Sequence, residues 1–385
     1  MILDSIAPLE TKVGFATLET MKSDMPGTDL TYLLPEAQSA VSFYLPFDKE
    51  MILKYLGKVD PSIRGIHEEE NLELHRIIWR ACQRVKHWLI EQGYKAISVI
   101  PNNHYRTDVP NWQITLPPEL SLRYLAVASG VASFGWSGNV GTKEHGTAIL
   151  VAGLITSAKL EPTKRIPESE GFCNKCMICT KVCAFGMFSE EEATTVTIGG
   201  ETFTYSKRGP MMRCFITCGG GNGLHRSGKF STWSPGRYEY AENNKELNRV
   251  CQIAMTSQRK RLPYQDSSDG YAAASHDGKY RTQLTCGNCN YICAGNTKET
   301  ALRYKTLVNS GCVIQREDGC LEVYPPEKAK EVFESMPNKH QRLYTRDYKN
   351  KCQKKLRKKR QLREYQKKKQ IKKQIKINNN KLMSI

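Results

Sequence analysis

The stretch CNKCMICTKVC at residues 173–183 carries four cysteines, spaced by two, two and three intervening residues. A second stretch, CGNCNYIC at residues 286–293, carries three more, spaced by two and three. In two-cluster ferredoxins, three closely spaced cysteines wrap one [4Fe–4S] cluster, and the fourth binds the other cluster. Zinc sites use pairs of closely spaced ligands instead. The two stretches therefore predict a module that holds two [4Fe–4S] clusters.

In this arrangement the two motifs exchange their last cysteines. The predicted ligands of the first cluster are Cys173, Cys176, Cys179 and Cys293. The predicted ligands of the second cluster are Cys183, Cys286 and Cys289, which leaves one position open. On the residues alone, three cysteines outside the motifs compete for that eighth position: Cys214, Cys218 and Cys251.

The other cysteines are predicted not to bind metal. Cys82 falls on the apolar face of an expected helix, where a cysteine acts as a small core residue. Three more are late and isolated in the sequence: Cys312, Cys320 and Cys352.

The positive charge of the chain is concentrated near its C-terminus. The formal net charge of the 385 residues is +18, but residues 339–381 contain 19 Lys and Arg against two acids. That segment carries +17, so the rest of the chain is near neutral at about +1. Its few apolar residues indicate a low-complexity tail, either disordered or a solvated helix.

Nothing in the sequence predicts export or a membrane span. No stretch approaches the ~20 uncharged apolar residues that a span requires. The N-terminus, MILDS, has neither a basic segment followed by an apolar block nor a twin arginine. The expected location is the cytoplasm, whose reducing conditions also suit metal-binding cysteines.

The sequence predicts an α+β protein in four parts. Residues 1–165 read as a mixed α/β domain, with apolar strands at 40–47, 96–100 and 147–156. Two helices are expected there, one with apolar residues at helical spacing over 74–89 and a stop at Gly93, the other over 120–132. Residues 166–300 form a two-cluster ferredoxin-like domain with an insertion at about 195–280. An extension at 301–338, with a helix at 327–336 after the prolines that end the compact sequence, precedes the basic tail at 339–385.

Three further segments resemble the epoxyqueuosine reductase and reductive dehalogenase superfamily. The turn FGWSGN at 134–139 is similar to the family's Gly-Trp-x-Gly-Lys/Asn turn, and GTAILVAGLIT at 146–156 to its Gly-Ser…Leu-Gly-x-Ile/Leu-x-Thr strand. RCFIT at 213–217 is similar to the family's Arg-Cys-Ile-Ser-Tyr segment, which supplies the eighth ligand. The resemblance covers about residues 95–295 and selects Cys214.

This resemblance implies a corrinoid-binding N-terminal domain, with cobalamin held beside the turn by Gly135, Trp136, Gly138 and Asn139. Electrons from a low-potential donor, ferredoxin or flavodoxin, would reach cobalt through the clusters and cleave a C–O or C–halogen bond. The family's queuosine enzymes act on tRNA, which the cations and tyrosines of the tail could bind. The other interpretation is an electron-transfer protein without a corrinoid.

The proton donor is where the sequence departs from the family. The queuosine enzymes carry an aspartate before the Gly-Trp turn as general acid. Counting back without gaps reaches Glu119, whereas aligning the neighbouring Arg-x-Leu-Ala-Val stretch reaches Leu116. The predicted catalytic residues are Glu119 and Tyr105, and the further candidates are Asp108 and His145.

Overall fold

A four-stranded antiparallel sheet forms in the first half of the chain, in the order β1-β2-β6-β3. Its strands are β1 (Val13–Thr17), β2 (Ser39–Pro46), β6 (Ile149–Thr156) and β3 (Ala96–Ser98). The central strands β2 and β6 pair over eight positions, from Ser39 opposite Thr156 to Pro46 opposite Ile149. The three strands predicted at 40–47, 96–100 and 147–156 are confirmed, although residue 100 lies outside the described part of the chain.

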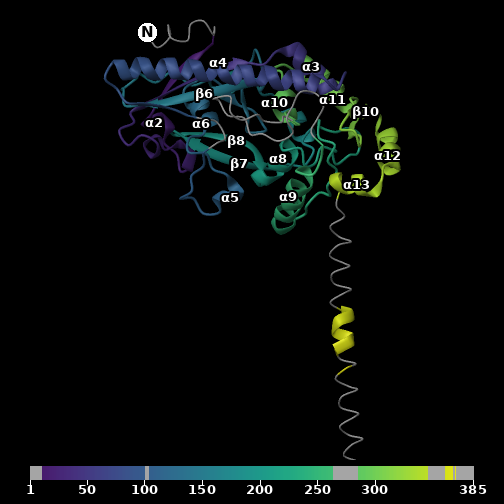
Figure 1. The fold of residues 1–385 in the computed structure, drawn as a ribbon. Helices are drawn as coiled ribbons and strands as arrows, with labels where there is room; N and C mark the ends of the chain where they lie inside the picture. The colour runs from purple at the N-terminus through teal and green to yellow at the C-terminus, as the bar shows by residue number, and fades with distance from the viewer. Residues whose placement is uncertain (1–10, 100–103, 263–284, 346–359, 367–368, 370–385) are drawn as a thin grey trace, which may run out of the picture. The chain divides into compact units, whose positions relative to one another are not determined.

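Helices cover both faces of this sheet because its side chains alternate between them. Val41 and Phe43 of β2 pack against Cys82 and Val85 of α4 (Ile63–Glu91). On the other face, α6 (Leu122–Ala128) packs its apolar side chains, among them Leu125, against the sheet. The helix expected over 120–132 is therefore present but shorter. Figure 1 shows α4 lying along the length of β6.

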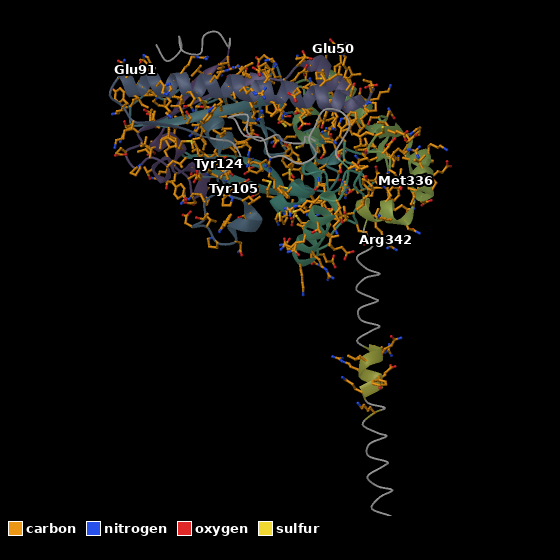
Figure 2. All side chains as sticks on the ribbon, viewed as in Figure 1. Glu50, Glu91, Tyr105, Tyr124, Met336 and Arg342 are labelled. Atoms are coloured by element: carbon orange, nitrogen blue, oxygen red, sulfur yellow. The ribbon has the colours of Figure 1, made fainter. Side chains whose placement is uncertain are left out.

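Helix α4 is longer than its apolar pattern predicts. It spans 29 residues and begins at Ile63, whereas the expected apolar face begins only at Leu74. Its first turns bury polar side chains, including an Arg64–Glu68 ion pair at 3.1 Å, and so carry no apolar stripe. At its other end Gly93 adopts φ +86°, as expected for a helix stop. Figure 2 shows Glu50 of α3 (Lys49–Gly57) and Glu91 at opposite ends of this layer.

The cysteine-rich part consists of short elements around the motifs. They are α7 (Ile178–Lys181), the hairpin β7 (Phe188–Ile198) and β8 (Glu201–Arg208), α8 (Met211–Cys218), α9 (Asn244–Gln258), α10 (Asn288–Tyr291) and α11 (Thr297–Val308). The N-terminal part adds α2 (Leu18–Met21), α5 (Trp112–Thr115), β4 (Ser133–Phe134), β5 (Val140–Gly141) and 3₁₀ turns at Pro26–Thr28, Leu30–Tyr32 and Glu168–Glu170. One core cluster joins the two parts, since Phe47 and Tyr55 pack with Trp233, Tyr291 and Leu307.

The computed structural model describes residues 11–99, 104–262, 285–345, 360–366 and 369. The chain divides into two units, Met1–Tyr344 and Thr345–Ile385. The regions expected as separate domains up to residue 338 thus fall in the first unit, consistent with the shared core. The class is mixed α+β, as predicted. No helix among the described residues is both long and apolar enough to cross a membrane.

The compact unit extends beyond the prolines at 325 and 326, contrary to the expectation that it ends there. The hairpin β9 (Cys312–Gln315) and β10 (Leu321–Tyr324) is followed by α12 (Pro326–Ser335) and α13 (Asn338–Tyr344). Tyr344 is 1% exposed and donates to Gln315 Oε1 at 2.7 Å. Six residues assigned to the basic tail therefore belong to the folded unit, because this mostly polar segment buries His340 and Tyr344.

Candidate metal centres

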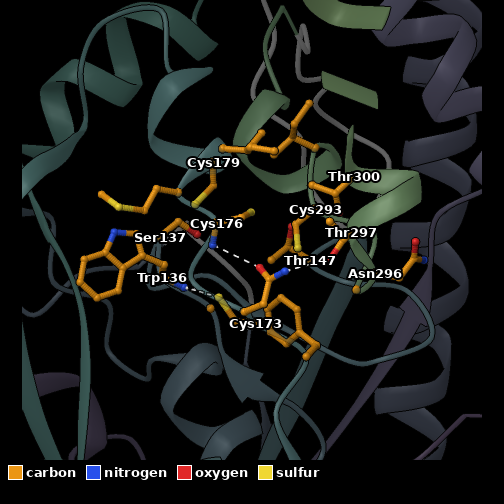
Figure 3. A pocket seen from close by; sticks show the side chains of 17 residues that line it. Trp136, Ser137, Thr147, Cys173, Cys176, Cys179, Cys293, Asn296, Thr297 and Thr300 are labelled. Atoms are coloured by element: carbon orange, nitrogen blue, oxygen red, sulfur yellow. Dashed lines mark hydrogen bonds between the residues drawn. The ribbon is translucent and has the colours of Figure 1, made fainter. Parts of the chain in front are cut away.

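The first predicted ligand set lines one cavity of about 160 Å³. Figure 3 shows the side chains of Cys173, Cys176, Cys179 and Cys293 around this cavity. Cys293 comes from the second motif, 110 residues beyond Cys183, so the structure brings the two motifs together here. The predicted exchange of terminal cysteines requires this proximity of Cys293 to the first motif.

The loop around Cys176 is shaped by two residues in the left-handed region. Lys175 has φ +58° and Met177 φ +60°, which turns the chain tightly between successive cysteines. Asn174 fixes the turn, because its Oδ1 accepts from the Cys176 backbone N–H at 3.2 Å and its Nδ2 donates to Thr297 Oγ1 at 3.0 Å. Thr297 begins α11, so the loop is tied to the helix that follows the second motif.

Backbone N–H groups point at the cysteine sulfurs. The Trp136 and Lys175 N–H groups donate to Cys173 Sγ at 3.2 and 3.4 Å, and the Met187 N–H donates to Cys183 Sγ at 3.2 Å. Such donors stabilise charge on sulfur and are one of the levers by which proteins tune iron–sulfur clusters. The indole Nε1 of Trp136, which lines the cavity, is buried without an acceptor among the described residues. Both features suit a sulfur-rich, anionic group.

In the first set, the thiol of Cys179 favours its protonated form. Burial, with the neighbouring Cys173, Cys293 and Cys176 adding to the effect, raises the pKa of Cys179 to about 12. Four thiolates this close would repel one another, so a cation between them is needed to hold them deprotonated.

The second site gathers five cysteines, one more than predicted. Burial raises the pKa of Cys183 to about 12, with Cys286 and Cys214 adding to the effect. Burial also raises the pKa of Cys289 well above its usual value, with Cys214, Cys286 and Cys183 as its charged neighbours. Cys214 and Cys218 lie on one face of α8 with their sulfur atoms 3.5 Å apart.

Cys218 shares a hydrogen bond with Cys214 in which either thiol can be the donor. Its pKa is raised well above the usual thiol value, first by its hydrogen bond with Cys214 and then by one with Cys286. The hydrogen bond with Cys218 lowers the pKa of both Cys214 and Cys286, the largest effect on each. Two of the three candidates for the eighth ligand are therefore at the site.

The third candidate, Cys251, lies elsewhere. It packs in the apolar cluster between α8 and α9, and its Sγ is 3.9 Å from Met255 Sδ. Cys82 and Cys312 are buried in apolar clusters, and Cys320 lies in the β9–β10 turn. Cys352 falls outside the described residues.

The 134–139 turn lies between the two cysteine sites. Trp136 contacts Cys173 as described, and Asn139 Nδ2 donates to the Cys289 carbonyl at 3.3 Å. Arg208 Nη2 donates to Asn139 Oδ1 at 2.5 Å, and its charge lowers the pKa of Cys214. Burial lowers the pKa of Arg208 itself to about 10, so it stays charged at neutral pH.

The two glycines of this turn approach protein side chains. A Cβ on Gly135 would lie 2.8 Å from the Phe172 ring, and one on Gly138 would lie 2.8 Å from the Tyr205 ring. Gly138 also has φ +70°, which disfavours any other residue.

The contacts that the described residues show for the predicted proton donors do not include the cysteines of either site. The Glu119 N–H bonds the His104 carbonyl at 3.3 Å, and Tyr105 forms a bridge with Pro118. Asp108 pairs with Arg106 at 2.7 Å, and His145 packs edge-on to Tyr44. Burial raises the pKa of Tyr105 and lowers that of His145. Leu116, the residue that the other alignment reaches, is the C-cap of α5 and has φ +48°.

Sequence reasoning missed two members of the second site. Cys218 was only an alternative to Cys214, although their four-residue spacing on a helix already places both on one face. Arg208 carried no local signal, because it reaches the site only through the pairing of β7 with β8.

Among the described residues, no group of three or more His, Cys, Asp and Glu side chains is arranged to hold a metal ion. A [4Fe–4S] cube makes a different demand, since its four cysteines bind four different irons and need not converge on one point.

No family model and no curated protein matches the chain. Among solved structures, it is similar to an epoxyqueuosine reductase in complex with a tRNA-Tyr stem loop, at 17% identity over 48% of this chain and 51% of that one, with a TM-score of 0.33. The Bacillus subtilis epoxyqueuosine reductase matches at 20% identity over 46% and 48%, with a TM-score of 0.30.

A reductive dehalogenase with a B12-dependent mechanism matches at 13% identity over 72% of this chain and 39% of that one, with a TM-score of 0.39. The chain spans about half the length of the epoxyqueuosine reductases that it matches. The structures to which this chain is similar thus include those of epoxyqueuosine reductases and reductive dehalogenases, the superfamily that its motifs resemble.

Proposed function

We propose that this chain is an iron–sulfur oxidoreductase with two [4Fe–4S] clusters. The observation that carries the proposal is the exchange of cysteines between motifs: Cys293 joins the first set, and Cys183 joins the second. Clusters of this kind supply single-electron transfer when bound. The chain's own residues would hold them, donate N–H groups to sulfur and exclude water.

The two ligand sets follow from the neighbours described above. The first consists of Cys173, Cys176, Cys179 and Cys293; the second consists of Cys183, Cys214, Cys286 and Cys289. Between them, the Trp136–Asn139 turn contacts Cys173 at one end and Cys289 at the other. A chain of short contacts between two redox centres is what electron transfer within one protein needs.

The resemblance extends this proposal to a corrinoid-dependent reductase that cleaves a C–O or C–halogen bond. The residues around the 134–139 turn do not fit that ring, because Gly135 and Gly138 are already covered by Phe172 and Tyr205. The cavity at this turn, at about 160 Å³, is also below the ~300 Å³ at which ligand pockets typically begin. We therefore assign no step to cobalt and no proton to Glu119 or Tyr105.

Elemental analysis tests both levels of the proposal. Anaerobically purified protein should contain about eight iron and about eight sulfide, with broad absorption near roughly 400 nm. Stoichiometric zinc without sulfide would refute the proposal. Cobalt in addition to iron would support the corrinoid-dependent reductase, and iron without cobalt an electron-transfer protein fed by ferredoxin or flavodoxin.

The basic tail supports a second element of the proposal, binding of tRNA. The 17 cations of residues 345–385 would contact phosphates, so affinity should fall by roughly 10³-fold or more between about 50 and about 200 mM salt if six or more phosphates are engaged. The deletion should start at residue 345, because Tyr344 is buried in the first unit. Equal tRNA binding by the full-length and shortened chains would exclude this role for the tail.

A further inference from the structure

The second site holds one thiol too many for one cluster. A [4Fe–4S] cube bound by cysteine alone takes four of them. The structure brings five to this place: Cys183, Cys214, Cys218, Cys286 and Cys289.

Cys218 is the one that the cube would leave free. Cys214 is an electrostatic neighbour of all three motif cysteines of the set, Cys183, Cys286 and Cys289. Cys218 instead places its Sγ 3.5 Å from that of Cys214, within hydrogen-bond distance. It thus lies beside Cys214, outside the set that Cys214 completes.

The fold holds Cys218 at that place. The hydroxyl of Thr285, which is fully buried, donates to the carbonyls of Thr217 and Cys218, each at 2.9 Å. Thr285 directly precedes Cys286, so the end of α8 is fastened to the second motif. The Trp233 N–H in turn bonds the Thr285 carbonyl at 2.8 Å. Cys218 therefore does not depend on a cluster for its position.

We propose that Cys218 is a hydrogen-bond donor to the Cys214 sulfur of the second cluster and sets the reduction potential of that cluster. The inference rests on the proposed function. Hydrogen bonds to the sulfurs are one of the determinants of cluster potential. A reduced cluster carries one more negative charge, which an S–H dipole directed at sulfur stabilises. Cys218 is thus a positioning and tuning residue and does not bind iron.

The test compares three variants of the full-length chain with the unchanged protein, by iron and sulfide content and by redox titration followed by electron paramagnetic resonance. Cys218→Ala should keep all iron and make one of the two midpoint potentials more negative. We expect the reduced-to-oxidised ratio of that cluster to fall about tenfold at a fixed potential, a shift of about 59 mV. Cys218→Ser keeps a donor and should recover most of the shift, and the control Cys251→Ala should change neither quantity.

Loss of about half of the iron in both Cys218 variants would make Cys218 a ligand and overturn the inference. An unchanged midpoint potential in Cys218→Ala would overturn it as well, while leaving the proposed function intact. If Cys218→Ala does not fold, Cys218→Ser carries the test: all iron and a near-normal potential support the donor role, and lost iron contradicts it. Unchanged protein without iron and sulfide would instead refute the proposed function, and this inference with it.

Discussion

The two cysteine sites begin from similar spacings but differ in their surroundings. The first is built on a loop and lines a cavity, and Cys176 is exposed to solvent. The second is formed in part by cysteines of α8 and lies beside the fully buried Thr285, and Cys286 is itself buried. It also has a half-buried cation, Arg208, and a fifth thiol, for which the first site has no counterpart among the residues that line its cavity.

This difference indicates that the two clusters would have different roles. Solvent access suits exchange of electrons with a partner, whereas a site with its own cation and donor has a potential set by the protein. Because Arg208 and Cys218 both favour added negative charge, we expect the second cluster to have the higher midpoint potential.

The largest effect should come from removing a ligand at the first site. Cys176→Ser should reduce the iron content from about eight to about four, because each cube has its own ligand set. The signals of the second cluster should persist in electron paramagnetic resonance. Cys320→Ala is the matched control, since Cys320 lies in a surface turn. Loss of all iron would show that the two sites depend on each other.

An equal loss is expected at the second site from Cys214→Ala, again to about four iron. The remaining signal should be that of the first cluster, so this variant and Cys176→Ser should give complementary spectra. Cys251→Ala removes a buried thiol from the same region and should retain all iron, because it packs against Met255. Full iron content in Cys214→Ala would refute its assignment as a ligand.

A smaller effect should follow from neutralising the cation of the second site. Arg208→Gln retains a donor for Asn139 but removes a charge beside Cys214 and Cys289. The midpoint potential of the second cluster should become more negative, by about 59 mV for a tenfold change in the ratio, with the first cluster unaffected. Equal shifts of both potentials in a redox titration would place Arg208 between the sites.

The smallest effect concerns His67, which packs 5.0 Å from the ring of Tyr291 in the second motif. Both its ring nitrogens are buried without a partner among the described residues, and burial lowers its pKa from 6.5 to about 4. The unfolded chain therefore binds a proton that the folded chain does not, and stability falls as the pH drops through this window.

His67→Phe should remove up to about 3 kcal/mol of this acid sensitivity, at 1.36 kcal/mol per pKa unit. Denaturant titrations at pH 7 and at pH 4.5 measure the free energy of unfolding of both proteins. This free energy should fall more between pH 7 and pH 4.5 in the unchanged protein than in His67→Phe, and that difference should exceed the difference between the two proteins at pH 7. An identical pH dependence in both proteins would contradict the assignment.

Much of the fold was predictable because its signals are local. The apolar runs of β2 and β6 specify buried strands, and the apolar stripe from Leu74 specifies the second half of α4. The spacing of the seven motif cysteines likewise predicts both the kind of metal group and the exchange of ligands.

What the sequence left open depends on contacts between distant segments. It offered three cysteines for the eighth position, and only the packing of α8 against the second motif brings Cys214 and Cys218 there and leaves Cys251 behind α8. Arg208 reaches the second site by strand pairing. The first turns of α4 bury polar side chains, such as the Arg64–Glu68 pair, and an apolar pattern cannot predict them. Local spacing determines which atoms can bind a metal, whereas the environment that tunes it is assembled from residues far apart in the chain.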